Sequence, residues 1–488
     1  MKILVIGLDG AAPALLFGDE RLTNFRRLME GGCYGRLTSP IPPSAVPTWM
    51  CLATSQDPGS LGVYGLRNRT GYAYSAVGLV NSHSIQAPAL WDQVAQEGKR
   101  AILVGVPPSY PPRQIHGLCV GCYLTPDTQQ TTYTYPATLQ QEIADLVGHY
   151  PVDVPRSRPH QKDWLKAAIY SMSRKQFTVV RHLLLQHEWA YFQFVEMGLD
   201  HIQRGFWKFH DPQHRHYQPG NPYEQVIRDY YRHLDAEFGA VLELLDAETI
   251  ILVASTPGAQ RLAGSFCMNE WLVHEGLLVL HDYPSTITPF RQLSVHWEKT
   301  KVWCAGGDVA HVFLNVKGRE PRGTLEPAAY EMFRDEVKAR LEALVDDQGQ
   351  PLGAQVWKLQ ELYSTVRHVA PDLLVHFGSL SWRALGSVGY PTLYVQEDDV
   401  ALDDCNPTQD GSLIVAAPNN PLQGAIAGAH VLHVAPTLLE LGGYDVPSSM
   451  QGTSLLASAG LSADVSPGLS ADEEELIRTR LSGLGYIA

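Results

Sequence analysis

The sequence predicts a layered α/β fold with a mostly parallel central sheet and an inserted α+β subdomain. Short apolar runs, typical of strands buried on both faces, alternate with longer helical patterns along the chain. The chain has 488 residues, more than the ~100–200 typical of one domain, and its texture changes between about 259 and 400. Hydrophobic residues make up 45% of the chain, which is enough apolar material for a large core.

The first part of the chain supplies two strands and two helices. Residues 3–8 form a continuous apolar run, as expected of a buried parallel strand. A helix is expected over 22–30, because two glycines stop the pattern there. Residues 89–98 follow a helical pattern, and 100–106 is the next buried strand.

Two long helices, each followed by a strand, come next. The helices are expected over 161–188 and 223–245, and the strands over 189–195 and 249–254. The same alternation returns with a strand over 412–417 and a helix soon after it. This order of elements is typical of parallel α/β units.

The regular alternation of helix and strand patterns gives way to short mixed segments, and this change predicts three regions. We expect the α/β core to be formed by 1–258 and 401–458, and 259–400 to form an inserted or lid subdomain with a helix over 328–344. The last region, 459–488, is predicted to be a C-terminal tail that ends in an acidic helix.

The composition excludes several classes of protein. Because 37 Lys and Arg face 51 Asp and Glu, the net charge is −14, and we expect neither nucleic acid nor an anionic membrane as a partner. No apolar stretch is long enough to insert into a membrane, and the N-terminal run is too short for a signal peptide, so a cytoplasmic protein is expected. The seven cysteines are dispersed, and Cys119 and Cys122 are interpreted as small apolar residues near a strand end.

Candidate chemistry lies where the predicted strands end. In a parallel sheet, ligands gather at the carboxyl ends of the strands. Asp9 follows the first strand, Asp200 follows the strand at 189–195, and Thr256 follows the strand at 249–254. A carboxylate on such a rigid support suits a metal ligand, although Asp9 could equally cap the next helix.

Ten colinear stretches between residues 5 and 488 resemble one known family. They are VIGLDG at 5–10, IPPSAVPTW at 41–49, DPGSLGVYGLRNR at 57–69, VPPSYPP at 106–112, EMGLDHIQRGFWKFHDP at 196–212, MNEWLVHEGLL at 268–278, FLNVKGREPRG at 313–323, SWRALGSVG at 381–389, HVAPTLLELGG at 433–443 and RLSGLGYIA at 480–488. The chain resembles the alkaline phosphatase superfamily, in its branch of type I phosphodiesterase/nucleotide pyrophosphatase-like proteins. The resemblance implies a three-layer alkaline-phosphatase-like core, two divalent metals and a Thr or Ser nucleophile that cleaves phosphoesters through a covalent phospho-enzyme.

Most of the family's site residues are replaced in this chain. The resemblance places the nucleophile at Ala45, which has no hydroxyl. It places the six metal-ligand positions at Asp9, Asp200, Arg204, Thr256, Pro257 and Pro407. Only Asp9 and Asp200 match the expected ligands, and two carboxylates alone hold a hydrated Mg²⁺ weakly.

Two functions follow from this pattern. The preferred one is a non-hydrolytic pseudoenzyme with a degenerate metal site, which needs no cofactor and binds a phosphate-bearing small molecule or a protein partner. The alternative is an active metal-dependent phosphodiesterase, nucleotide pyrophosphatase or phosphotransferase that uses zinc, manganese or magnesium at a reduced or relocated site. Its nucleophile would be Ser44 or Thr48, although we expect these hydroxyls to cap or hydrogen-bond within the Pro-rich loop.

Three further groups of residues are candidates for the site, and two of them have two interpretations each. Arg204 follows Asp200 by four residues on one helix face, so we expect its guanidinium to replace a metal cation beside Asp200, Asp9 or both. The histidines of one short segment are either a relocated metal site or packing and solvated residues; they are His201, His210, His214 and His216. A loop near residue 65 either faces phosphate or packs structurally; its residues are Tyr64, Arg67 and Arg69.

Overall fold

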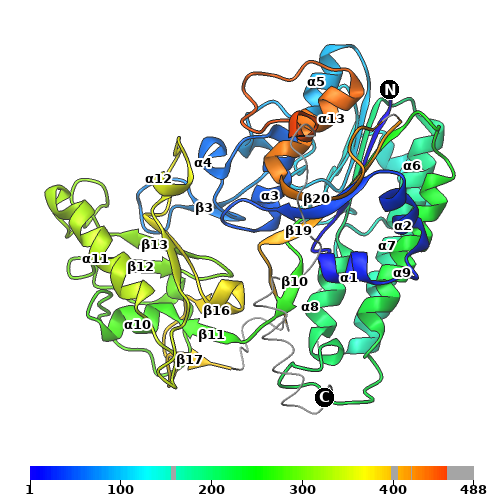
Figure 1. Ribbon diagram of the computed structural model, residues 1–488. Helices are drawn as coiled ribbons and strands as arrows, with labels where there is room; N and C mark the ends of the chain where they lie inside the picture. The colour runs from blue at the N-terminus through cyan, green and yellow to red at the C-terminus, as the bar shows by residue number, and fades with distance from the viewer. Residues whose placement is uncertain (155–160, 397–404, 419, 459–488) are drawn as a thin grey trace.

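A nine-stranded sheet forms the centre of the computed structural model, which describes residues 1–154, 161–396, 405–418 and 420–458 (Figure 1). The sheet runs in the order β20 (Gly424–His430), β2 (Cys33–Thr38), β19 (Asp410–Ala416), β9 (Ile250–Ser255), β1 (Ile3–Leu8), β8 (Tyr191–Glu196), β5 (Ala101–Val104), β6 (Gly117–Val120) and β7 (Thr134–Tyr135).

Most neighbouring strands of this sheet are parallel. β1 lies between β9 and β8 and is parallel to both, as are β5 to β8, β6 to β5 and β20 to β2. β19 is the strand expected over 412–417; it forms there, but it runs antiparallel to β2 and β9, and β7 is antiparallel to β6. The predicted mostly parallel α/β fold is confirmed.

Helices cover both faces of the sheet and produce three layers. One face carries α1 (Pro13–Gly18), α2 (Thr23–Glu30), α6 (Leu139–Val147), α7 (Lys162–Gln186), α8 (Gly198–His210) and α9 (Val226–Leu242). The other carries α3 (Ala45–Thr54), α5 (Leu90–Gln96) and α13 (Val434–Gly442). β1 shows why both layers form, since Leu4 and Ile6 join the first cluster while Ile3 and Val5 join the second.

The segment from β11 to β17 builds a second lobe, on the left in Figure 1. It contains a four-stranded antiparallel sheet of β12 (Val302–Ala305), β13 (Ala310–Leu314), β15 (Leu373–His376) and β14 (Gln355–Trp357), and a three-stranded sheet of β16 (Trp382–Leu385), β11 (Gly264–Cys267) and β17 (Tyr394–Val395). Its helices are α10 (Met268–His274), α11 (Tyr330–Glu342) and α12 (Leu359–Leu362). This lobe has its own apolar cluster, around Phe266 and Phe377.

Short elements connect the two lobes. They are α4 (Pro58–Leu61), the hairpin of β3 (Arg67–Arg69) and β4 (Val77–Leu79), and the antiparallel pair of β10 (Ala259–Arg261) and β18 (Cys405–Pro407). The pair of β10 and β18 returns the chain to the core.

The predicted helices form within a few residues of their expected limits. The helix expected over 328–344 forms as α11 and is preceded by a 3₁₀ turn at Pro327–Ala329. The predicted tail and acidic helix at 459–488 lie outside the described residues. In the part of the chain that is described, no helix combines the length and hydropathy needed to span a membrane.

Candidate functional site

Asp9 lies at the carboxyl end of β1, between the ends of β8 and β9. Its backbone N–H donates to the carbonyl oxygen of Glu196 (2.9 Å), and the residue is only 4% exposed. Its carboxylate oxygen Oδ1 accepts hydrogen bonds from the Thr256 hydroxyl (2.6 Å) and the Trp49 indole N–H (3.2 Å). Asp9 therefore does not cap the following helix, which was one of its two expected roles.

The second carboxylate is positioned by the start of α8. The buried carboxylate of Glu196, at the end of β8, accepts the backbone N–H groups of Gly198 (2.8 Å) and Leu199 (3.0 Å) and the hydroxyl of Tyr230 (2.7 Å). Free N–H groups at the first turn of a helix favour such an acceptor. This arrangement starts α8 directly after β8 and brings Asp200 beside the end of β1.

Arg204 pairs with Asp200 across one turn of α8. Its Nε donates to Asp200 Oδ1 at 2.7 Å, and the two side chains are 22% and 19% exposed. Gly10 packs against the same helix: a Cβ on it would lie 3.7 Å from the Asp200 Cα, and its carbonyl oxygen accepts the Gln203 side-chain amide (2.7 Å). The expected contact between Arg204 and Asp200 is thus present in the structure.

The electrostatics of Asp9 reflect both its burial and its neighbours. Burial raises the pKa of Asp9 to about 6, and the negative charge of Asp200 contributes to the increase. The hydrogen bonds from Thr256 and Trp49 and the positive charge of Arg204 act in the opposite direction. Asp9 therefore takes up a proton near pH 6, whereas an ordinary aspartate takes one up only near pH 4.

The two prolines of the expected ligand set lie in adjoining backbone. Pro257 follows β9, and Pro407 ends β18 opposite Ala259 of β10. β10 and β18 both contact α8, the helix that carries Asp200. A proline side chain has no donor atom, and Pro407 contributes only its carbonyl oxygen, which accepts from Gln260 Nε2 (2.9 Å).

Ala45 is the first residue of α3, and the nearby hydroxyls differ from expectation. We expected Ser44 and Thr48 to cap or to hydrogen-bond within the loop, and this interpretation is wrong. Ser44 is the N-cap residue, but it closes the first turn through its carbonyl oxygen, which accepts from the Thr48 N–H (3.0 Å). Both hydroxyl oxygens are buried without a hydrogen-bond partner among the described residues.

The donor set offers little to a metal ion. Across residues 1–154, 161–396, 405–418 and 420–458, no group of three or more His, Cys, Asp and Glu side chains is placed to share one. The histidines considered for a relocated site have other contacts: His201 Nε2 lies 2.7 Å from Asp153 Oδ1, His210 Nδ1 lies 3.3 Å from the Glu224 carbonyl, and His214 Nδ1 accepts from the backbone of His216.

Two of the three residues named in the loop near residue 65 pack against the second lobe, whereas Arg67 is exposed. Arg69 lies within 3.2 Å of Glu320 of the second lobe, and its guanidinium stacks over Trp303 and Phe313. The Tyr64 hydroxyl donates to the Arg367 carbonyl (2.7 Å). Arg69 and Tyr64 therefore connect the core to the second lobe.

Two residues of the centre, Trp49 and Gln203, were not predicted from the sequence. Trp49 lies in a stretch that was singled out only because it resembles the family. Trp49 follows Ala45 by four residues, which puts both on one face of α3, and this spacing could have indicated that its indole reaches the centre. Gln203, which holds Gly10, has no signal in the sequence because its partner is a backbone carbonyl 193 residues away.

Three solved structures of similar fold are distant from this chain in sequence. A phosphonoacetate hydrolase from Sinorhizobium meliloti, solved with phosphonoformate, is 15% identical, with a TM-score of 0.59 over 91% of this chain and 96% of that chain. Murine ectonucleotide pyrophosphatase/phosphodiesterase 5 is 12% identical, with a TM-score of 0.53 over 94% and 100%. An inactive threonine-to-alanine variant of the murine protein in complex with AMP also matches, with a TM-score of 0.53 over 94% and 99%.

The family itself is identified by a family model. No curated protein matches the chain. The model described as type I phosphodiesterase / nucleotide pyrophosphatase matches residues 3–402, which include the central strand β1, the helix α8 and the second lobe. The chain therefore belongs to the type I phosphodiesterase / nucleotide pyrophosphatase family.

Proposed function

We propose that this family member is a pseudoenzyme that does not hydrolyse phosphoesters and acts by binding a phosphate-bearing small molecule. The observation that carries the proposal is the pairing of both remaining carboxylates with donors from the protein: Asp9 with Thr256 and Asp200 with Arg204. A two-metal centre needs most of its ligands to hold both ions and to activate a nucleophile. Ala45, at the expected nucleophile position, has no group that could attack phosphorus.

Arg204 supplies the positive charge that two neighbouring carboxylates require. Two like charges in a buried site are unfavourable unless one is neutralised or a cation is near. A guanidinium also suits the oxygens of a phosphate group, which it can bind with two N–H donors. Arg204 uses Nε toward Asp200, and its side chain is 22% exposed.

A distant structure of the same fold supports binding in the absence of hydrolysis. The murine protein carrying a threonine-to-alanine substitution is described as inactive and is solved in complex with AMP. An alanine also stands at the expected nucleophile position of the present chain, at Ala45. We take AMP as the first probe for this reason.

A second function is favoured by one observation, the two buried hydroxyls of Ser44 and Thr48 that lack a hydrogen-bond partner among the described residues. If one of them were a relocated nucleophile, the chain would be an active phosphodiesterase or phosphotransferase. Zinc, manganese or magnesium would then be held by Asp9 and Asp200, and the ion would polarise the phosphoryl group.

Hydrolysis and binding assays on the purified protein test the proposal. We expect p-nitrophenyl phosphate and bis(p-nitrophenyl) phosphate to be hydrolysed at background rate with Zn²⁺, Mn²⁺ or Mg²⁺ supplied, and calorimetry to detect AMP binding. Activity that disappears in the Ser44→Ala, Thr48→Val double variant would establish the alternative enzyme. Absence of both hydrolysis and AMP binding would contradict a phosphate-bearing ligand and favour the protein partner that the sequence also suggested.

A further inference from the structure

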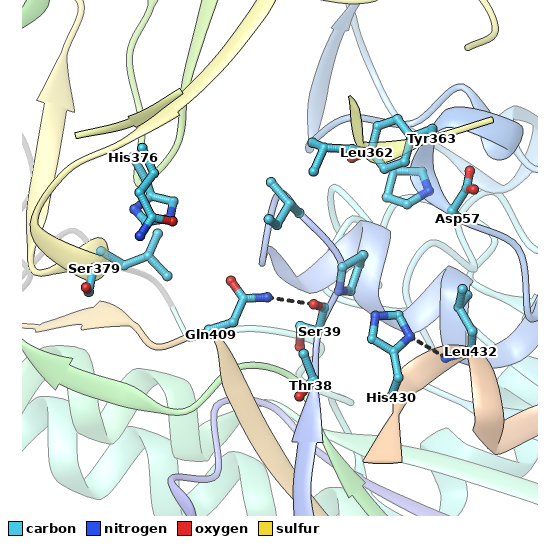
Figure 2. Close-up of a pocket in the computed structure, with 15 residues that line it drawn as sticks. Thr38, Ser39, Asp57, Leu362, Tyr363, His376, Ser379, Gln409, His430 and Leu432 are labelled. Atoms are coloured by element: carbon cyan, nitrogen blue, oxygen red, sulfur yellow. Dashed lines mark hydrogen bonds between the residues drawn. The ribbon is translucent and has the colours of Figure 1, made fainter. Parts of the chain in front are cut away.

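A cavity of about 610 Å³ lies between the core and the second lobe. Figure 2 shows side chains from both lobes around it. The core contributes Ile41, which precedes α3, and Leu432, which follows β20; the second lobe contributes Leu362 of α12 and Leu380. Because both lobes line the cavity, a group that fills it contacts both lobes at once.

The lining is mainly apolar. Besides the four residues just named, it includes Pro40, Pro58 and the ring of Tyr363. Among the described residues that line the cavity, none is Lys or Arg, and Asp57 contributes a carboxylate. Apolar surface of this kind is more favourable when it is covered than when it faces water.

The two histidines of the lining add no charge at neutral pH. Burial lowers the pKa of His376 to about 4, and burial together with the charge of His433 lowers the pKa of His430 to about 4. Both imidazoles are therefore neutral at pH 7. The cavity as a whole favours an apolar occupant without charge, because a charged group would lose its hydration there and find no opposite charge.

The last part of the described chain runs along the rim of this cavity. The side-chain oxygen of Gln451 accepts the backbone N–H of Asp57 (2.6 Å). The N–H of Gly452 donates to the Ser55 hydroxyl (2.9 Å), which in turn donates to the Leu432 carbonyl (2.6 Å). Asp57 and Leu432 both line the cavity, so the chain is held at its rim just before the described residues end at 458.

The residues beyond 458 are numerous enough to return to the cavity. Ser458 follows Gly452 by six residues and therefore lies within about 20 Å of it. The stretch from Ser458 to Leu481 can span up to about 75 Å when extended, and a helical part shortens this only to about 50 Å. Length therefore permits the segment 481–488 to reach the cavity.

The composition of the segment 481–488 matches the lining. Its sequence is LSGLGYIA, with four large apolar side chains and no Asp, Glu, Lys, Arg or His. Segments that stay in water have few aromatic and large apolar residues and many charges. The block 472–475, DEEE, has that composition, whereas 481–488 has the composition of a segment that is buried against a surface.

We propose that the segment 481–488 of the same chain docks in this cavity. Leu484, Tyr486 and Ile487 then cover its apolar lining, and the acidic block at 472–475 stays in solvent. The proposal is independent of the function proposed above, because Asp9 and Asp200 are not among the described residues that line the cavity.

Disulfide cross-linking of the full chain is the direct test. All seven native cysteines are buried, so an oxidant such as copper–phenanthroline reaches engineered cysteines first. Ala488→Cys is paired with Gln355→Cys, at an exposed position of the lining, and in a control chain with Leu185→Cys, at a leucine 60% exposed on α7.

We expect the pair at 488 and 355 to cross-link within one chain about tenfold faster than the pair at 488 and 185, because docking raises the effective concentration of one thiol near the other. Equal rates would overturn the proposal. A cross-linked dimer in place of the intramolecular product would show that a second copy supplies the segment, and the proposal of docking within one chain would be wrong.

Two pairs of substitutions outside the cavity separate apolar docking from simple proximity. Leu484→Asp with Tyr486→Asp, added to the chain with cysteines at 488 and 355, should lower the rate to that of the control. Glu473→Gln with Glu475→Gln, in the acidic block, should leave the rate unchanged. Equal effects of the two pairs would contradict docking through the apolar side chains.

Binding of the neutral dye Nile red measures whether the cavity is covered. The wild-type chain should bind little dye, and Leu484→Asp with Tyr486→Asp should raise its fluorescence, because the apolar lining becomes accessible. Leu362→Trp, which places a larger side chain in the cavity, should reverse that increase. A wild-type chain that binds the dye as strongly as the double variant would show an open cavity and would contradict the proposal.

Discussion

Each carboxylate of the centre has a hydrogen-bond donor of its own within the protein. Asp200 has the guanidinium of Arg204, and Asp9 has the hydroxyl of Thr256 and the indole of Trp49. In the proposed pseudoenzyme these donors take the place of metal ions. Removing one of these donors should therefore destabilise the fold, and the pH dependence of stability should depend on the buried Asp9.

Arg204→Met should lower the free energy of unfolding by about 1–3 kcal/mol at pH 7, because a partly buried Asp200 loses its charged donor. Arg36→Met is the matched control: Arg36 is 77% exposed and 3.7 Å from Asp410, so its loss should cost less than about 0.5 kcal/mol. Urea denaturation measures both. An Arg204 variant as stable as the Arg36 variant would show that the pair does not support the centre.

The raised pKa of Asp9 predicts a stability that decreases as the pH rises. In the unfolded chain Asp9 ionises near its ordinary pKa of 3.8, whereas the folded chain keeps the proton until about pH 6. The folded state thus binds more protons between these values, and its stability should fall by roughly 2–3 kcal/mol across that window. The difference in unfolding free energy between the wild type and Asp9→Asn isolates this effect. A difference that rises with pH, or stays flat, would contradict the assignment.

At the scale of elements, α3 and α8 place the site, and they differ in how their first turns are satisfied. α8 begins on the carboxylate of Glu196, which accepts two of its N–H groups. α3 begins at Ser44 without a side-chain cap, and its two nearby hydroxyls have no partner in the described part of the chain. These hydroxyls either have no role or bind a ligand. Removing a hydroxyl that caps a helix would lower the free energy of unfolding, so stability measurements show whether these two act as caps.

Ser44→Ala with Thr48→Val should leave the free energy of unfolding within about 0.5 kcal/mol of the wild type, or raise it, because no hydrogen bond is lost. Asp235→Ala is the positive control, since this carboxylate accepts the backbone N–H groups of Asn24 (3.0 Å) and Phe25 (2.9 Å) at the start of α2. It should cost about 1–2 kcal/mol. A double variant as unstable as this control would show that the hydroxyls are structural.

The elements of the core could be predicted from the sequence because their patterns are local. β1 and β9 appear as apolar runs, and α7 as a long helical pattern, within a few residues of their real limits. The direction of β19 could not be predicted, since a buried strand has the same apolar run whichever way it runs. The orphan hydroxyl of Ser44 could not be predicted either, because the choice between side chain and carbonyl depends on the geometry of the turn.

At the scale of the whole molecule, the hairpin of β3 and β4 connects the core to the second lobe. Arg69 of β3 and Glu320 of the second lobe are 4% and 0% exposed and lie 3.2 Å apart. The ring of Tyr74, between β3 and β4, stacks on Trp297 with 3.5 Å between centroids. The two lobes are thus held together by buried charge and aromatic contacts.

Arg69→Met should destabilise the protein by about 1–3 kcal/mol, because the buried carboxylate of Glu320 loses one of its two cations and keeps only Arg319. Arg67→Met, at an exposed position two residues earlier on the same strand, should change stability little. Thermal unfolding of both variants provides the comparison. Equal melting temperatures would contradict a fastening role for Arg69.

The measurement that tests the central claim most directly is the metal content of the purified protein. Inductively coupled plasma mass spectrometry, after incubation with Zn²⁺, Mn²⁺ and Fe²⁺ and removal of unbound ions, should find much less than one equivalent of each. The reason is that only two of the six expected ligand positions, Asp9 and Asp200, still carry a metal-binding side chain. Both carboxylates also accept hydrogen bonds from other side chains of the protein. About two equivalents of a transition metal, lost in the Asp9→Asn and Asp200→Asn variants, would show a working two-metal centre and contradict the account.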